Sequence, residues 1–190
     1  MASRNEYFEL TTKKLPNQIL VDFIANNKPW KNRIEIGAGA GNDTNYLLQQ
    51  WYTVLAIDWE ETSQQYILEK IWDTYKDTFS FSKQKLENLI FEFCDVVYSA
   101  YTLPFCEEKF FDNMMEYITI NINSWGYFVW NFFWPNDDWK HLSLRSEEQI
   151  KEYFKDFHIL DIANKEYDKW TATSNNPKHW HEIWMIAKKK

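Results

Sequence analysis

The sequence predicts an α/β fold with a doubly wound sheet of about seven strands, mostly parallel and with an antiparallel last strand. Short apolar runs alternate with amphipathic segments along most of the 190 residues, as in parallel sheets with right-handed crossovers. Three of the four glycines stand at positions 37, 39 and 41, directly after the first apolar run. The last two apolar runs have no helical segment between them, which predicts an antiparallel pair at one edge of the sheet.

The first half of the chain shows both helical and strand periodicity. Ile19, Leu20, Phe23 and Ile24 recur at the spacing of one helix face. A continuous apolar run is typical of a parallel strand that is covered on both faces. The expected elements are a helix over 15–27, a strand over 33–36, a helix from Asn42 or Asp43 to about Trp51, a strand over 53–57, a helix over 62–75 and a weaker strand over 79–86.

The second half continues the alternation and then ends in strands. Ser146 and Gln149 form a capping box at the start of a helix. No repeat or low-complexity linker appears, so we expect residues 1–190 to form a single domain that includes a helical segment within 1–30. The expected elements are strands over 95–100 and 127–133, a helix over 107–120, a helix from 147 to about 157, and closing strands over 158–163 and 181–187.

Composition and charge narrow the classes of function. A formal net charge of −7 disfavours a nucleic-acid partner, because polyphosphate binding requires a basic face. The amino terminus is polar and no apolar run has membrane-spanning length, so we expect a cytoplasmic protein without a membrane partner. Neither cysteine belongs to a Cys-x-x-Cys pair, so Cys94, Cys106, His179 and His181 predict no metal site.

The glycine cluster predicts a nucleotide-binding loop. Residues without side chains let a ligand lie against main-chain N–H groups. The next strand ends in Asp58, where a carboxylate can accept hydrogen bonds from ribose hydroxyls. A nicotinamide site requires Gly-x-Gly-x-x-Gly, but the third position is Asn42 or Thr44. A P-loop is excluded because no Gly-Lys-Ser/Thr follows the glycines.

The pattern Glu35-x-Gly37-x-Gly39-x-Gly41 resembles motif I of the class I S-adenosylmethionine-dependent methyltransferases. Segments 95–106 and 177–181 resemble parts of small bacterial methyltransferases related to the tellurite-resistance type. The resemblance covers nearly the whole chain from Leu15. It implies the Rossmann-like class I methyltransferase fold, S-adenosylmethionine as the methyl donor with S-adenosylhomocysteine as product, and a small-molecule acceptor.

The resemblance also implies a set of residues that bind the methyl donor. The three glycines would pass beneath its amino-acid and ribose portions, and Asp58 would accept its ribose hydroxyls. Glu35 would either fix the loop or bind the amino group of the methyl donor, and Asp58 could instead cap the following helix. The implied set is Glu35, Gly37, Ala38, Gly39, Gly41, Asp43, Thr44, Asp58, Trp59, Tyr98 and Ser99.

One position departs from the family pattern. Methyltransferases often place an acid after the third strand, near the adenine, whereas this sequence has Lys85 close to that point and Glu87 two residues later. Adenine would then be contacted by backbone groups there.

Residues for the chemical step are sought beyond the carboxyl ends of the strands, where ligands bind in open α/β sheets. Asn131 is a polar residue within an apolar strand, so it marks either the site or a bend. His179 and His181 are two apart in an extended segment and would point the same way, either as a general base or as a packed or solvent-facing pair. Further candidates are Tyr98, which is a third possible base, Ser99, Tyr101 and residues 131–134.

The leading functional hypothesis is therefore methyl transfer from S-adenosylmethionine to a small molecule. The alternative from another class is a non-catalytic module or partner subunit that binds the methyl donor or its product. The sequence leaves the acceptor and the oligomeric state open.

Overall fold

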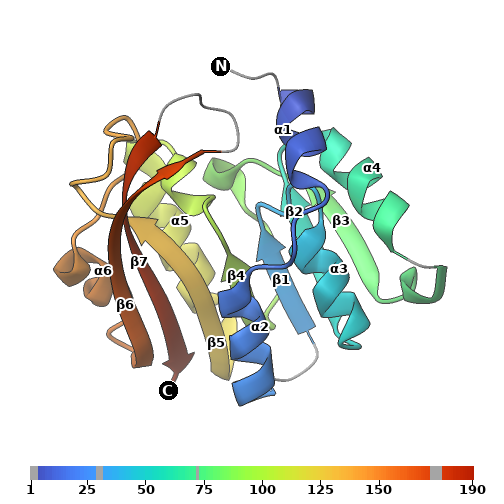
Figure 1. Cartoon of the computed structure of the whole chain (residues 1–190). Helices are drawn as coiled ribbons and strands as arrows, with labels where there is room; N and C mark the ends of the chain where they lie inside the picture. Colours follow the sequence, from blue (N-terminus) through green and yellow to red (C-terminus); the bar gives the residue numbers. More distant parts are fainter. Residues whose placement is uncertain (1–3, 29–31, 72, 172–176) are drawn as a thin grey trace.

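The structure is a computed structural model, and it describes residues 4–28, 32–71, 73–171 and 177–190. These residues build one seven-stranded sheet with the order β3-β2-β1-β4-β5-β7-β6 (Figure 1). Neighbouring strands from β3 to β5 are parallel, whereas β7 is antiparallel to both β5 and β6. The expected fold class is confirmed, including the antiparallel last strand. The strands are β1 (Asn32–Ile36), β2 (Thr53–Asp58), β3 (Phe79–Lys83), β4 (Cys94–Ser99), β5 (Ile122–Phe133), β6 (Phe157–Trp170) and β7 (Pro177–Lys189).

Helices cover both faces of the sheet and create two apolar layers. On one face, Leu20, Leu47 and Ile67 come from three helices and pack together with Val54 and Val129 of the sheet. The other face buries a larger cluster that is rich in aromatic and methionine side chains, centred on helix α5. The first face carries α2 (Gln18–Asn27), α3 (Asn42–Gln49) and α4 (Glu61–Lys70), and the second carries α5 (Glu108–Ile120) and α6 (Glu147–Tyr153).

Helix α1 (Arg4–Thr11) was not among the expected elements. It lies above the sheet, beside α4, at the end where the parallel strands terminate (Figure 1). The Phe8 ring is buried and stacks on Tyr66 of α4 with ring centroids 5.1 Å apart. Among the side chains that the structure describes on this helix, Phe8 is the one buried apolar side chain, so the sequence shows no repeating apolar face there.

The two closing strands are much longer than expected. β6 and β7 pair from Phe157 and Lys189 at one end to Trp170 and Pro177 at the other, and form a ribbon that reaches above the sheet (Figure 1). Most side chains of β6 beyond Ala163 are exposed, so the extension shows little apolar alternation.

The helix expected over 62–75 is also different. It ends at Lys70, and a separate 3₁₀ turn covers Asp73–Tyr75, while residue 72 lies outside the described residues. In the described part of the chain, no helix is long and apolar enough to cross a membrane.

Candidate functional site

A cleft of about 480 Å³ lies at the end of the sheet where β1, β2 and β4 terminate. This volume falls within the range of about 300–1,000 Å³ that is usual for small-molecule sites. The glycine loop, the ends of β2 and β3, the turn after β4 and helix α1 all contribute to its walls. The lining includes Tyr7, Phe8, Gly37, Gly39, Asp58, Trp59, Lys85, Glu87, Tyr101, Thr102 and Phe105.

The three glycines of the loop all have left-handed φ angles, of +84° at Gly37, +50° at Gly39 and +75° at Gly41. A Cβ atom at Gly37 would lie 1.9 Å from Thr102 Oγ1, and one at Gly41 would lie 2.4 Å from Ile67 Cγ1. At Gly39 the nearest atom would be the Gly37 carbonyl oxygen, at 4.0 Å. Packing therefore requires Gly37 and Gly41, whereas Gly39 leaves open space in the cleft that a ligand can occupy.

Asp58 ends β2 and lines this open space. Its Oδ2 atom accepts a hydrogen bond from the Gly39 N–H at 2.8 Å, and Oδ1 accepts from the Glu60 N–H at 2.9 Å. Each carboxylate oxygen has more than one lone pair, so both can still accept from a ligand. The half-exposed ring of Trp59 follows directly, and the Lys85 ammonium lies 5.6 Å from its centroid.

Glu35, Asp43 and Thr44 form a buried layer that supports the loop from below. Glu35 accepts a hydrogen bond from the Thr44 hydroxyl, and Asp43 accepts from the Asn17 N–H at 2.6 Å. Burial, and then the Asp43 carboxylate, raise the pKa of Glu35 well above its usual range. These three side chains are not part of the cleft lining. Of the two roles left open for Glu35, its contacts support the fixing of the loop.

Tyr98, Ser99 and Ala38 also lie beneath the surface of the cleft. The Tyr98 hydroxyl donates to Asp43 at 2.7 Å, and the Ser99 hydroxyl donates to the Ile36 carbonyl at 2.8 Å. Ala38 is buried, as are Tyr98 and Ser99. The structure therefore does not bring Tyr98 to the position that a catalytic base would need, because its hydroxyl faces a buried carboxylate.

The two histidines point the same way, as expected, toward Glu166, and both lie outside the cleft lining. His179 Nε2 lies 3.0 Å and His181 Nδ1 lies 3.6 Å from Glu166 Oε1 on β6. Hydrogen bonds to Asp168, and then to Glu166, raise the pKa of His179. His181 is buried and stacks on Trp134, with centroids 5.4 Å apart. Both side chains therefore hold the β6–β7 ribbon together, and neither lines the cleft.

Comparison with known proteins identifies the kind of domain. Residues 34–118 match the family model described as a methyltransferase domain. That stretch contains the glycine loop, Asp58 and the turn after β4. The matched stretch, a little under half of the chain, is therefore similar to a methyltransferase domain. No curated protein sequence gives a significant match.

Solved structures, some of them named as methyltransferases, share the fold. TehB from Haemophilus influenzae has a TM-score of 0.80 and 21% identity, over 100% of this chain and 68% of that chain. NodS, an N-methyltransferase from Bradyrhizobium japonicum WM9 in complex with S-adenosylhomocysteine, has a TM-score of 0.71 and 13% identity. The match covers 98% of this chain and 97% of that chain. The 1,6-didemethyltoxoflavin-N1-methyltransferase of Burkholderia thailandensis has a TM-score of 0.69 and 16% identity. The match covers 100% of this chain and 92% of that chain.

The methyltransferase domain implies S-adenosylmethionine as its cofactor, and the cleft fits this compound. The open space at Gly39 admits a ligand against the main chain. Asp58 faces the same space with oxygens that can accept from ribose hydroxyls, and Trp59 offers a ring to a base.

Three features of the cleft were missed or left open by sequence reasoning. Tyr7 and Phe8 reach it from α1, and Phe105 reaches it from the 3₁₀ turn Leu103–Phe105. Glu87 and Lys85 both line the cleft after β3, so a carboxylate is present there, displaced by two residues from the usual position. The position of the turn directly after a buried strand was the available signal for Phe105.

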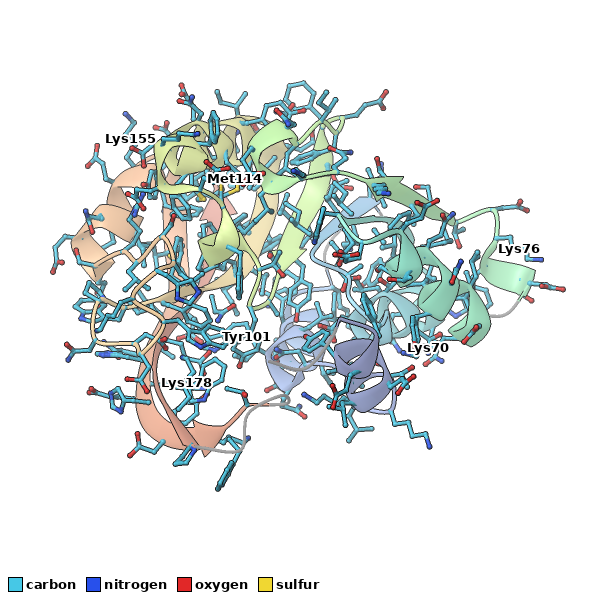
Figure 2. The ribbon with its side chains drawn as sticks, turned by 90° about the horizontal axis from the view of Figure 1, so that it is seen from above. Lys70, Lys76, Tyr101, Met114, Lys155 and Lys178 are labelled. Carbon is cyan, nitrogen blue, oxygen red and sulfur yellow. The ribbon has the colours of Figure 1, made fainter. Side chains whose placement is uncertain are left out.

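Tyr101 joins the cleft to an aromatic cluster that lies outside the lining and contains a buried ion pair. Tyr101 contacts the rings of Trp180 and Trp184, with centroids 5.9 Å and 5.6 Å away. The buried Lys178 ammonium lies 2.5 Å from Asp137 Oδ1 and 3.6 Å from the Trp180 centroid. Burial lowers the pKa of Lys178. Figure 2, which views this end of the sheet, shows Tyr101 near the centre and Lys178 on the side of the β6–β7 ribbon.

Proposed function

We propose that this protein transfers a methyl group from S-adenosylmethionine to a small-molecule acceptor. The observation that carries the proposal is the open space at Gly39 beside Asp58, inside a cleft of the matched methyltransferase domain. The Burkholderia relative, whose structure contains 1,6-didemethyltoxoflavin and S-adenosylhomocysteine, supports a small-molecule acceptor by analogy.

Six of the cleft residues have a proposed role in binding the methyl donor or excluding water. The main chain at Gly37 and Gly39 lies against the amino-acid and ribose portions, Asp58 accepts the ribose hydroxyls, and Trp59 packs on the adenine. Because the methyl group of a sulfonium is already electrophilic, the protein must mainly align the acceptor and exclude water. The rings of Tyr7 and Phe8 on α1 cover the cleft and would exclude water from it.

The charge of the lining agrees with these roles. Asp58, Glu60, Glu87 and Glu107 contribute four carboxylates, against the ammonium of Lys85 among the lining residues. An acidic cleft favours a cationic sulfonium and repels a polyphosphate backbone. This balance supports the choice of methyl donor and argues against a nucleic-acid acceptor.

One observation favours the rival function, a non-catalytic module that binds the methyl donor or its product. Tyr98, His179 and His181, the general bases expected from the sequence, are all absent from the cleft lining. The two functions differ in one measurable product, because only an enzyme releases S-adenosylhomocysteine in the presence of an acceptor.

Thermal unfolding with a panel of nucleotides tests the proposed cofactor. A ligand at one hundred times its Kd stabilises a protein by about 2.7 kcal/mol, which corresponds to a rise in Tm of roughly 5–10 °C for a chain of this size. We expect this rise with S-adenosylmethionine and S-adenosylhomocysteine and none with NAD or ATP. A rise with NAD alone would overturn the proposal.

We further propose a cytoplasmic location. Cys94 and Cys106 are buried and unpaired, and burial raises the pKa of each thiol to about 12. Buried unreactive thiols are typical of proteins in reducing compartments. Fractionation of cells that express the tagged chain tests the location, and recovery outside the cytoplasm would contradict it.

A further inference from the structure

Tyr101 is the aromatic residue of the cleft whose backbone is strained. Its φ angle is +56°, in the left-handed region that a bulky side chain rarely adopts. Four non-glycine residues in the described part of the chain have such an angle, and Tyr101 is the one among them that lines the cleft. Strained backbone of this kind persists where the surrounding structure holds it, and it collects at functional sites.

Asn131 holds Tyr101 in this conformation. It is a buried residue of β5, and its Oδ1 accepts a hydrogen bond from the Tyr101 N–H at 2.6 Å. Its Nδ2 donates to Glu182 Oε2 at 3.3 Å, and Trp184 Nε1 donates to the same oxygen at 2.6 Å. Because both ends of the carboxamide are engaged, its oxygen stays directed at the Tyr101 backbone, and the paired strands fix the position of Tyr101.

The ring of Tyr101 is fixed as well. It packs edge to face with Trp180 and Trp184 of β7, at interplanar angles of 76° and 83°. The ring of Phe133 on β5 lies 6.3 Å away, between centroids. Tyr101 nevertheless keeps a relative exposure of 38% and lines the cleft. A ring whose orientation is set before a ligand arrives loses little freedom on binding, which favours affinity.

The strand order separates Tyr101 from the groups proposed to bind the adenosyl part of the methyl donor. In the order β3-β2-β1-β4, Asp58 and Trp59 stand at the end of β2, on one side of the glycine loop that follows β1 (Figure 1). Tyr101 follows β4, on the other side. Phe105, in the next turn, also lines the cleft and is exposed. With adenine on Trp59, these two rings are left for the acceptor.

Charge narrows the class of acceptor. Glu107 lies two residues after Phe105 and lines the cleft together with Glu87. The Glu107 N–H donates to Glu87 Oε1 at 3.2 Å, which brings the two residues together. Carboxylates outnumber the ammonium of Lys85 among the lining residues. A negatively charged acceptor would be repelled there, so the two rings are suited to a neutral molecule.

We propose that the acceptor is a neutral planar aromatic molecule, and that Tyr101 determines this specificity by packing its ring against it. Asn131 is the positioning residue that holds the ring in the cleft. This inference rests on the proposed function. Aromatic rings pair with one another in offset-stacked or edge-to-face arrangements, whereas a saturated ring system offers no π-system to the pair. The site therefore distinguishes a flat ring system from its saturated counterpart.

The test uses naphthalen-2-ol as the planar probe and decahydronaphthalen-2-ol as its saturated counterpart. Calorimetry first measures the binding of S-adenosylhomocysteine, and failure at that stage would refute the proposed function and not only the role of Tyr101. Each probe is then titrated into protein saturated with S-adenosylhomocysteine. We expect the planar probe to bind about five- to tenfold more tightly than the saturated probe. Naphthalene-2-carboxylate, a planar anion, should bind more weakly than naphthalen-2-ol.

Substitutions at two rings of the cleft separate the acceptor from the methyl donor. Tyr101→Leu should bring the affinity ratio of the planar and saturated probes to about one, whereas Tyr101→Phe keeps the ring and should keep the wild-type ratio. Trp59→Leu is the matched control, because it removes a ring on the donor side. It should weaken the binding of S-adenosylhomocysteine and keep the probe ratio at saturation. A wild-type ratio in Tyr101→Leu would overturn the proposal, as would wild-type protein that binds S-adenosylhomocysteine but binds no naphthalen-2-ol, or binds either other probe as tightly.

Two further variants test Asn131 as the positioning residue. Asn131→Ala removes the group that accepts from the Tyr101 N–H but keeps both rings, so the planar probe should lose its advantage. Asn131→Asp keeps an oxygen at the same place and should restore the advantage. A purely structural role would lower the Tm of Asn131→Ala without changing the affinity ratio of the two probes, and that result would overturn the role assigned to Asn131.

Discussion

The glycine loop and the cluster around Tyr101 lie at the same end of the sheet and are built in opposite ways. The glycine loop uses contiguous residues, and its main features are left-handed backbone at Gly37, Gly39 and Gly41. The cluster around Tyr101 uses side chains from distant strands, since Tyr101 is thirty positions from Asn131 and farther still from Glu182. A site of the first kind is visible as a motif, whereas one of the second kind exists only after the strands have paired.

The two regions also differ in whether a substitution would impair ligand binding or folding. The loop presents main-chain groups and one carboxylate to the ligand, so changes there should affect binding more than folding. The cluster around Lys178 and Glu182 buries charges among aromatic rings, so changes there should affect folding first. The following predictions test this distinction.

The largest expected effect comes from Gly39→Val. A branched side chain would fill the open space of the cleft and is also unfavourable at a φ of +50°. We expect no measurable binding of S-adenosylhomocysteine by calorimetry, in a protein that still folds. Gly41→Ala is the matched control, because its Cβ would collide with Ile67 and should lower stability by about 1–3 kcal/mol. Normal binding by Gly39→Val would refute the placement of the ligand.

Lys178→Met should destabilise the protein by about 3–5 kcal/mol, because it leaves the Asp137 carboxylate buried without its partner. Urea unfolding measures the loss. Adding Asp137→Asn to this variant should restore part of the stability, since the unpaired charge is then removed. If Lys178→Met alone is as stable as wild type, the aromatic cluster around Lys178 does not depend on the ion pair.

Asp58→Ala should weaken the binding of S-adenosylhomocysteine. Hydrogen bonds to a charged group contribute about 1.5–3 kcal/mol each, which is at least a tenfold loss in affinity per bond. Calorimetric titration provides the measurement. Asp43→Asn is a control within the buried layer, and it should alter Tm more than affinity because Asp43 bonds Asn17 and Tyr98.

Phe8→Ala should have a moderate effect on binding through helix α1. The ring lines the cleft and stacks on Tyr66, so we expect affinity for S-adenosylhomocysteine to fall about tenfold, equivalent to about 1.4 kcal/mol. Leu10→Ala on the same helix is the control, because Leu10 is exposed and does not line the cleft. Equal affinities for the two variants would mean that α1 does not cover the bound ligand.

The smallest effect is the pH dependence that arises from Glu35. Its pKa in the folded protein is raised above an unfolded value of about 4.3. The folded state therefore binds this proton more tightly, and the resulting stability is present below about pH 4.3 and is lost as the pH rises through the folded pKa. Glu35→Gln should flatten the fall in unfolding free energy with rising pH. Glu152→Gln, at an exposed position, should leave the slope unchanged.

Several parts of the fold could be predicted because their signals are local. The run 53–57 and the capping box at Ser146 match the observed β2 and α6. The extension of β6 could not be predicted, since its side chains are mostly exposed and it is stabilised by pairing with β7. Helix α1 could not be predicted for a related reason. It packs on α4 through the single buried ring of Phe8, which leaves no apolar periodicity in the sequence.

The candidate site divides in the same way. The structure places Gly37, Gly39, Asp58 and Trp59 in the cleft lining. For Tyr98, sequence reasoning found the right strand, but alternation along the strand turns its side chain toward Asp43. Such a difference depends on which face of a strand meets which helix, and no residue spacing within the strand reveals it.

The sequence by itself determined the order of strands and helices and the loop of bare main chain, because periodicity and glycine act over a few neighbouring residues. Only the tertiary structure decided that Glu182, Asn131 and Tyr101 meet, and that the two histidines do not reach the cleft. The physical reason is that hydrogen bonds between distant strands depend on register and on the facing of side chains, which are fixed only when the whole sheet is assembled.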